Sequence, residues 1–288
     1  MSRPDRLRPV CNHVRMGGTR KYERPPVRRT VLTVYFDPVE NFDLEMITRL
    51  HSRWSERYPA SQQSFPETRP DELPTASPFR AAFGGFPAPA VLQISRSLSR
   101  TISYQYDQIS FSWQFDPEAP DNTYPGFEAL SKELHSNFEF FADVVEKFAD
   151  KPLKVQGGQC YYDNELANTE GVDWISGYLS NWTGTVARNR LEGAEYVGFR
   201  WRNESDNERL GTHRVTKVQL DSGTDWEETE IDINVLSLPL EGSQIEGKPP
   251  TEQARLLLDD AHDLEISTFE KLINDELRAS WGKSDGTA

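Results

Sequence analysis

Two kinds of hydrophobic periodicity follow one another in this chain and constrain its fold more than any other feature. Between residues 102 and 115, apolar side chains alternate with Ser and Gln. This period of two predicts antiparallel strands with one buried and one solvated face. Apolar residues then recur at helical spacing: Phe127, Leu130, Leu134, Phe138, Phe141, Val145 and Phe148. Such a broad stripe must pack on a sheet or on another helix.

The segment before these strands contains a strand, a helix and a proline-rich stretch. Residues 30–36 are β-branched and aromatic, which predicts a buried strand. Asn41 or Asp43 can cap a helix of about four turns, in which Leu44, Ile47, Leu50 and Trp54 recur every three or four positions before Tyr58-Pro59 ends it. Residues 59–90 contain seven of the 19 prolines, so we expect a long irregular loop there.

The second half repeats this order of elements. Strand-like segments cover residues 184–191, 194–201, 215–220 and 230–238, and a long helix follows, with Gly282 as its expected C-cap. We therefore predict an α+β fold in which antiparallel sheets are packed by long amphipathic helices. The repeated order favours two similar α+β halves, residues 25–165 and 166–288, after a disordered tail at residues 1–24.

Charge is divided unequally along the chain. Residues 1–30 carry nine Lys or Arg against two acidic residues, whereas the rest of the chain has a net charge of −21. An acidic body repels nucleic acid and favours basic protein partners. The basic tail is the exception, and its Arg15, Arg20, Lys21 and Arg24 are the candidates for phosphate contacts.

The cellular compartment is indicated by features that the sequence lacks. No apolar run approaches the roughly 18 residues of a transmembrane helix, and the N-terminus has no apolar segment typical of a secretory signal. Only Cys11 and Cys160 are present, so a structural disulfide is not expected. We therefore expect a cytoplasmic protein without a membrane segment.

Several short motifs occur in an order that resembles a known protein family. They are Glu23–Val27, Ser112-Trp113, Tyr124-Pro125, Tyr162-Asp163-Asn164, Ala261-His262 with Phe269, and Trp281-Gly282. This order resembles a sporadically distributed family of bacterial and archaeal cytoplasmic proteins, about 250 residues long, a usual size for one or two domains. The family has no assigned activity, so the resemblance implies no catalytic residues. Its patchy distribution is similar to that of defence and toxin–immunity genes.

One pair of residues on the C-terminal helix is a candidate for acid–base chemistry. On a helical wheel His262 lies at the edge of the apolar stripe, and Glu265, one turn further on, lies nearer its centre. A neighbouring carboxylate tunes the pKa of a histidine and makes the pair suitable for proton transfer. The competing interpretation is a histidine on a helix face that is bonded to a backbone carbonyl or to water.

An acidic run over residues 221–232 is a candidate for metal binding. Its carboxylates occur without an intervening Lys or Arg, and Asp225, Glu230 and Asp232, with His213 upstream, are the candidate ligands of a divalent metal. Their spacing matches no calcium loop, so the alternative is a solvated turn with charges that point outward from a strand.

These observations favour a non-enzymatic, cytoplasmic protein-binding protein without a cofactor. We expect a basic partner and a role in defence or toxin immunity, with the sheets and the 59–90 segment as the recognition surface. One alternative is a hydrolase or nuclease that uses a divalent metal at residues 221–232. A second alternative is nucleic-acid binding through the tail.

Overall fold

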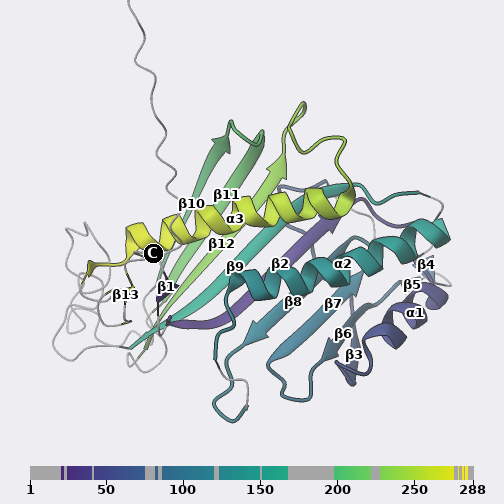
Figure 1. The fold of residues 1–288 in the computed structure, drawn as a ribbon, viewed down its shortest axis with the longest axis horizontal. Coiled ribbons are helices and arrows are strands. Elements are labelled where there is room, and N and C mark those ends of the chain that lie inside the picture. Colours follow the sequence, from purple (N-terminus) through teal and green to yellow (C-terminus); the bar gives the residue numbers. More distant parts are fainter. Residues whose placement is uncertain are drawn as a thin grey trace, which may run out of the picture.

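The computed structural model describes most of the chain between residues 21 and 284. The described residues are 21–22, 25–40, 42–74, 82–83, 86–119, 123–149, 151–167, 198–221, 228–275, 278, 281 and 283–284. Their main feature is a nine-stranded antiparallel sheet with the strand order β10-β11-β12-β9-β2-β8-β7-β6-β3 (Figure 1). The predicted α+β class is confirmed at this level.

The strands of the sheet fall into two consecutive series along the chain. The first comprises β2 (Val27–Phe36), β3 (Ala60–Ser64), β6 (Ala90–Ile94), β7 (Arg100–Gln105) and β8 (Gln108–Gln114). The second comprises β9 (Val155–Ala167), β10 (Gly198–Asn207), β11 (Thr212–Asp221) and β12 (Glu228–Pro239). Two small pairs lie outside the sheet, β1 (Lys21–Tyr22) with β13 (Lys283–Ser284) and β4 (Ala82–Phe83) with β5 (Phe86–Pro87).

Both series place their strands in the same order. In the first, β2 is followed across the sheet by β8, β7 and β6, and in the second β9 is followed by β12, β11 and β10. The two series meet where β2 and β9 pair antiparallel in the middle of the sheet. One sheet therefore contains strands from both predicted halves, and β9 itself crosses residue 165, the predicted boundary.

Three helices, α1 (Leu44–Trp54), α2 (Phe127–Ala149) and α3 (Pro250–Leu272), cover one face of this sheet. Figure 1 shows α2 and α3 side by side, with α1 beside α2 near the β3 edge. The Asp43 carboxylate accepts a hydrogen bond from the Met46 backbone N–H at 3.0 Å, which confirms the predicted cap of α1. None of the helices in the described ranges is long and apolar enough to cross a membrane.

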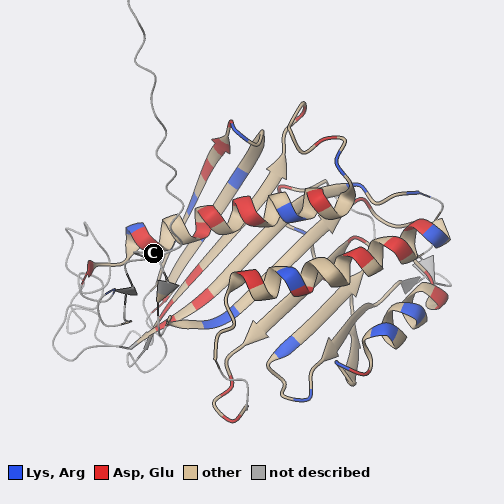
Figure 2. Ribbon diagram, viewed as in Figure 1, with Lys and Arg blue, Asp and Glu red and all other residues tan. Residues whose placement is uncertain are grey.

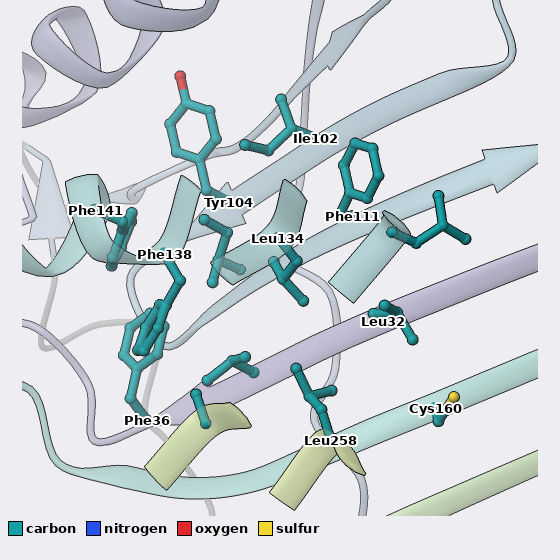
Figure 3. Packing of buried hydrophobic residues seen from close by; sticks show 14 of the residues in the cluster. Leu32, Phe36, Ile102, Tyr104, Phe111, Leu134, Phe138, Phe141, Cys160 and Leu258 are labelled. Carbon is teal, nitrogen blue, oxygen red and sulfur yellow. The ribbon is translucent and has the colours of Figure 1, made fainter. Parts of the chain in front are cut away.

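The core lies between the helices and the sheet. Figure 3 shows Phe138 and Phe141 of α2 above Phe36 of β2, and the Phe36 and Phe141 ring centroids are 5.2 Å apart. Cys160 of β9 and Leu258 of α3 belong to the same buried cluster. Because this one cluster includes residues from both series of strands, the helix-facing side of the sheet is buried as a single unit.

Part of the proline-rich segment covers the opposite face of the sheet. Leu73 packs there with Tyr35 and Leu236 in a small separate cluster. The buried Arg69 lies 3.8 Å from the carboxylate of Asp107, which is fully buried. Arg69 and Leu73 therefore hold part of this segment against the sheet, and residues 66–74 have the irregular backbone that the sequence predicted.

Two predicted boundaries are wrong for identifiable reasons. Ala60–Ser64, predicted as loop, forms edge strand β3, because backbone pairing with β6 stabilises a segment without apolar alternation. The last helix ends at Leu272 and does not reach Gly282, since Ile273 is extended and fully buried. In addition, the predicted tail contains β1, and Tyr22 packs edge-on against Trp281.

Candidate functional site

A cavity of about 690 Å³ opens between α2 and α3, above the middle of the sheet. The first turn of α2 and the residues before it form one wall, and residues 259–270 of α3 form the other. Tyr162 and Asn164 of β9 contribute from the sheet, and Pro25–Val27 from the start of β2. This volume lies within the usual range for small-ligand pockets.

Four polar side chains form a chain of contacts in this cavity. The hydroxyls of Tyr124 and Tyr162 are 2.8 Å apart and share a hydrogen bond. The Tyr162 hydroxyl lies 3.4 Å from Nδ1 of His262, and the same nitrogen lies 3.9 Å from Oε2 of Glu265. The first turn of α2 fixes the imidazole, because Phe127 stacks on it with a centroid distance of 3.7 Å.

Burial shifts the pKa values of Glu265 and His262 in opposite directions. Glu265 is 1% exposed, and burial raises the pKa of its carboxyl well above the ordinary value. Burial lowers the pKa of His262 to about 4. At neutral pH the imidazole is therefore neutral, and burial favours the protonated form of the carboxyl beside it.

The position of Glu265 on α3 explains why an acidic group is buried. The buried side of the helix passes through Leu257, Ala261, Glu265 and Phe269 at intervals of one turn. An apolar side chain is the usual occupant of such a position, because a buried carboxyl needs hydrogen-bond partners. In the described part of the chain, Oε2 of Glu265 has no hydrogen-bond partner. A buried polar atom without a partner at a cavity wall is a feature of ligand sites.

The remaining charges around the cavity are acidic. Glu128, Asp259, Asp263 and Glu270 line it together with Glu265, and the described lining residues include no Lys or Arg. Figure 2 shows Asp and Glu recurring along α2 and α3. Asp259 is paired with Arg255 and Glu270 with Arg278, so the acidic surplus comes from the other three residues.

The six short motifs named in the sequence analysis converge on this cavity. Residues from four of them line it directly: Pro25, Pro26, Val27, Tyr124, Pro125, Tyr162, Asn164, His262 and Phe269. The other two lie one contact away, because Trp113 packs on Tyr124 at 5.3 Å and Trp281 stacks on Phe269 at 5.8 Å. Six motifs spread over most of the chain thus meet in one place.

The predicted pair His262 and Glu265 is therefore brought together. Of the predicted metal ligands, Glu230 and Asp232 share one face of β12, whereas His213 lies away from them. His213 is paired with Asp206 at 2.7 Å near one end of β11. Asp232 pairs with Gln219, which lies six residues from His213 along β11. At about 3.3 Å per residue, Asp232 is therefore about 20 Å from His213 along the sheet. Of the described residues, no group of three or more His, Cys, Asp or Glu is arranged to hold a metal ion.

Asp232 and Glu230 instead lie on the sheet face opposite the helices. Asp232 accepts a hydrogen bond from the Tyr161 hydroxyl at 3.0 Å and lies opposite Asp163 in the β9–β12 register. Burial and the charges of Asp232 and Glu230 raise the pKa of Asp163 to about 6. Asp225, the third predicted ligand, lies outside the described residues.

The predicted phosphate contacts also lie mostly outside the described part of the chain. Arg15, Arg20 and Arg24 are not described, and Lys21 is placed only as a backbone position in β1. Nucleic-acid binding through the basic tail therefore stays a prediction.

Three site residues were not predicted from the sequence as parts of a site: Tyr124, Phe127 and Tyr162. The Tyr162 and His262 contact joins positions 100 residues apart. No pattern within one segment predicts such a contact, although Tyr124 and Tyr162 both belong to the six short motifs named in the sequence analysis.

The sequence matches no protein-family model and no curated protein.

Proposed function

We propose that this chain is a cytoplasmic, non-enzymatic protein-binding protein, with the α2–α3 cavity at the centre of its recognition surface. The observation that carries the proposal is the convergence of the six resemblance motifs on this cavity. Motifs that only stabilised the fold would be spread through the core. Their concentration around a hollow with an unpartnered carboxyl oxygen supports a binding role.

The charge of the cavity and of the chain supports a basic partner. Five carboxyl groups line the cavity, and the chain beyond residue 30 has a net charge of −21. Charge complementarity of this kind steers association and selects partners. A cationic toxin is one partner of this chemistry, so a defence or immunity role belongs to the same proposal.

The internal repetition forms a further part of the proposal. The matching strand orders of the two series support an origin from two similar α+β halves that share one sheet. In this arrangement the cavity lies beside the β2–β9 junction, where the halves meet.

A cavity-filling variant tests the proposed function. Ile266 lines the cavity, and Ile266→Trp adds a bulky ring to that space. Wild-type protein immobilised as bait should retain basic proteins from a bacterial lysate at low salt, and Ile266→Trp should lose them. Leu44→Trp is the matched control, because Leu44 is 58% exposed on α1. Equal retention by Ile266→Trp and wild type, or no retention by wild type, would refute the proposal.

One observation favours a second candidate, acid–base catalysis by the pair on α3. Burial raises the pKa of the Glu265 carboxyl and lowers that of His262 to about 4, so the two are a potential acid and base in one cavity. Under this alternative Glu265 donates a proton and His262 accepts one. Turnover of a bound ligand that stops in both Glu265→Gln and His262→Phe would support it. A metal-dependent hydrolase or nuclease has less support, since Asp232 and His213 lie far apart on the sheet.

A further inference from the structure

The chemistry of the cavity wall identifies the group that it is suited to bind. Three lining carboxyl groups, on Glu128, Asp263 and Glu265, have no ion-paired Lys or Arg in the described part of the chain. Two of them are exposed at the rim, and Glu265 lies in the interior. A positive ligand group would therefore pass from an acidic entrance to a buried carboxyl group.

The apolar part of the wall is aromatic. Tyr124, Phe127, Tyr162 and Phe269 line the cavity around the polar groups. Aromatic faces attract ammonium and guanidinium groups, by about 0.5–2 kcal/mol per contact depending on desolvation. The same rings also bury an alkyl stem. An aromatic wall with a carboxyl group at depth thus matches a cation on an apolar stem.

One feature of the cavity favours an anion instead of a cation. The first turn of α2 borders it, and a helix N-terminus carries about half a positive charge, which favours anions. Glu128 lies within that first turn and offsets this partial charge. The remaining carboxyl groups of Asp263 and Glu265 are full or potential negative charges, so the electrostatic balance favours a cation.

We propose that the cavity binds an organic cation, an ammonium or guanidinium group on an apolar stem, with the charged group at Glu265. The stem lies between Phe127 of α2 and Phe269 of α3. This inference deepens the proposed function, because a lysine or arginine side chain of a basic partner has this structure. A free alkylamine has the same chemistry and is the second source.

Binding of a cation is coupled to proton release from the site. Burial raises the pKa of the Glu265 carboxyl well above its ordinary value, and a positive group beside it lowers that pKa and favours the carboxylate. The other titratable groups that face Glu265 are Cys160 and Tyr162 of β9, Tyr124 before α2, and His262 of α3. Burial raises the pKa values of Cys160, Tyr124 and Tyr162, and lowers that of His262. These four groups are therefore neutral near pH 7, which leaves Glu265 as the group whose protonation responds to a bound cation.

The test compares small alkyl probes whose head groups are positive, neutral or negative. Isothermal titration calorimetry at about pH 8 would use n-butylammonium, n-butylguanidinium, n-pentanol and butyrate. We expect binding of the two cations, with Glu265→Gln weakening it by about tenfold or more. Titration in buffers of different ionisation enthalpy should show proton release in the wild type only. Glu139→Gln, an exposed carboxylate further along α2, is the matched control and should bind as the wild type does.

Other outcomes separate this inference from the proposed function. Equal binding of n-pentanol, tighter binding of butyrate, or an unchanged affinity in Glu265→Gln would each overturn the cation assignment. Basic proteins retained by wild type and lost by Ile266→Trp would still support a binding function in that case. If cations bind, a short peptide with one central lysine distinguishes the source. Binding tighter than that of n-butylammonium indicates a partner side chain, and equal or weaker binding indicates a free amine.

Circular dichroism and thermal unfolding confirm that each variant is folded. Glutamine has nearly the shape of a protonated glutamic acid, so Glu265→Gln should keep the native spectrum. A loss of cation binding in a folded Glu265→Gln variant is therefore an effect on the site.

Discussion

Glu265 should make the protein less stable as the pH rises, and Glu265→Gln should remove this effect. The ordinary pKa of this carboxyl group is 4.5, and burial raises it well above that value in the folded protein. Above pH 4.5 the unfolded chain has released the proton while the folded protein still holds it. The unfolded state is then favoured by about 1.4 kcal/mol for each pH unit, up to the folded pKa.

His262 contributes a pH dependence of opposite sign. Its pKa falls from 6.5 in the unfolded chain to about 4 in the folded protein. Stability therefore rises between these two values, by about 3 kcal/mol in total. Above pH 4.5, where the titration ranges of His262 and Glu265 overlap, their contributions to stability have opposite signs in the wild type. Above pH 6.5 His262 is neutral in both states and adds no further pH dependence.

Urea unfolding at several pH values measures this difference directly. We expect the free energy of unfolding of Glu265→Gln, relative to wild type, to grow by about 1.4 kcal/mol per pH unit from about pH 5 upward. The growth ends at the folded pKa of Glu265. The exposed control Glu139→Gln should run parallel to the wild type over the same range. A constant difference between Glu265→Gln and wild type at every pH would refute the burial argument.

Three further changes test the core, a buried polar network and the tail. Phe138→Ala should lower the free energy of unfolding by about 3–5 kcal/mol, since Phe138 is fully buried. The control Phe65→Ala, at a position that is 86% exposed, should change it by less than about 0.5 kcal/mol. Asp260→Ala should cost about 3 kcal/mol in the same urea assay, because the buried Asp260 carboxylate accepts hydrogen bonds from Asn207, Thr212 and Ser237. Asp259→Ala, which loses a pair with the exposed Arg255, should cost less than about 1 kcal/mol. Deletion of residues 1–20 should leave retention on immobilised duplex DNA unchanged, and a log–log salt slope near about −5 found only with the full chain would instead assign DNA binding to the tail.

Local periodicity predicts the elements of this fold well, because each element buries one face. The alternation over residues 102–115 predicts β7 and β8, and the aromatic stripe predicts α2. Periodicity says less about partners, since the pairing of β2 with β9 joins segments more than 100 residues apart. It also fails at Ala60–Ser64, where backbone pairing and not side-chain burial forms the strand.

The candidate site could be predicted only in part for the same reason. Glu265 is recognisable because an acidic residue interrupts an apolar helical stripe, and His262 is its neighbour one turn away. The stacking of Phe127 on His262 and the Tyr124–Tyr162 hydrogen bond depend on how α2 and α3 lie over the sheet. No spacing within one segment contains that information.

The position of the cavity follows from the sizes of the β9 residues beneath α3. The residues at positions 158, 160, 162 and 164 share one face of the strand, because side chains alternate. At Gly158 α3 lies directly on the sheet, and a Cβ there would be 2.8 Å from that of Leu257. Further along the strand come Cys160 and then Tyr162, whose ring occupies space that a glycine leaves to the helix. The cavity and its buried carboxyl group therefore lie toward the Tyr162 end of the strand, where α2 begins, and away from the close contact of α3 at Gly158.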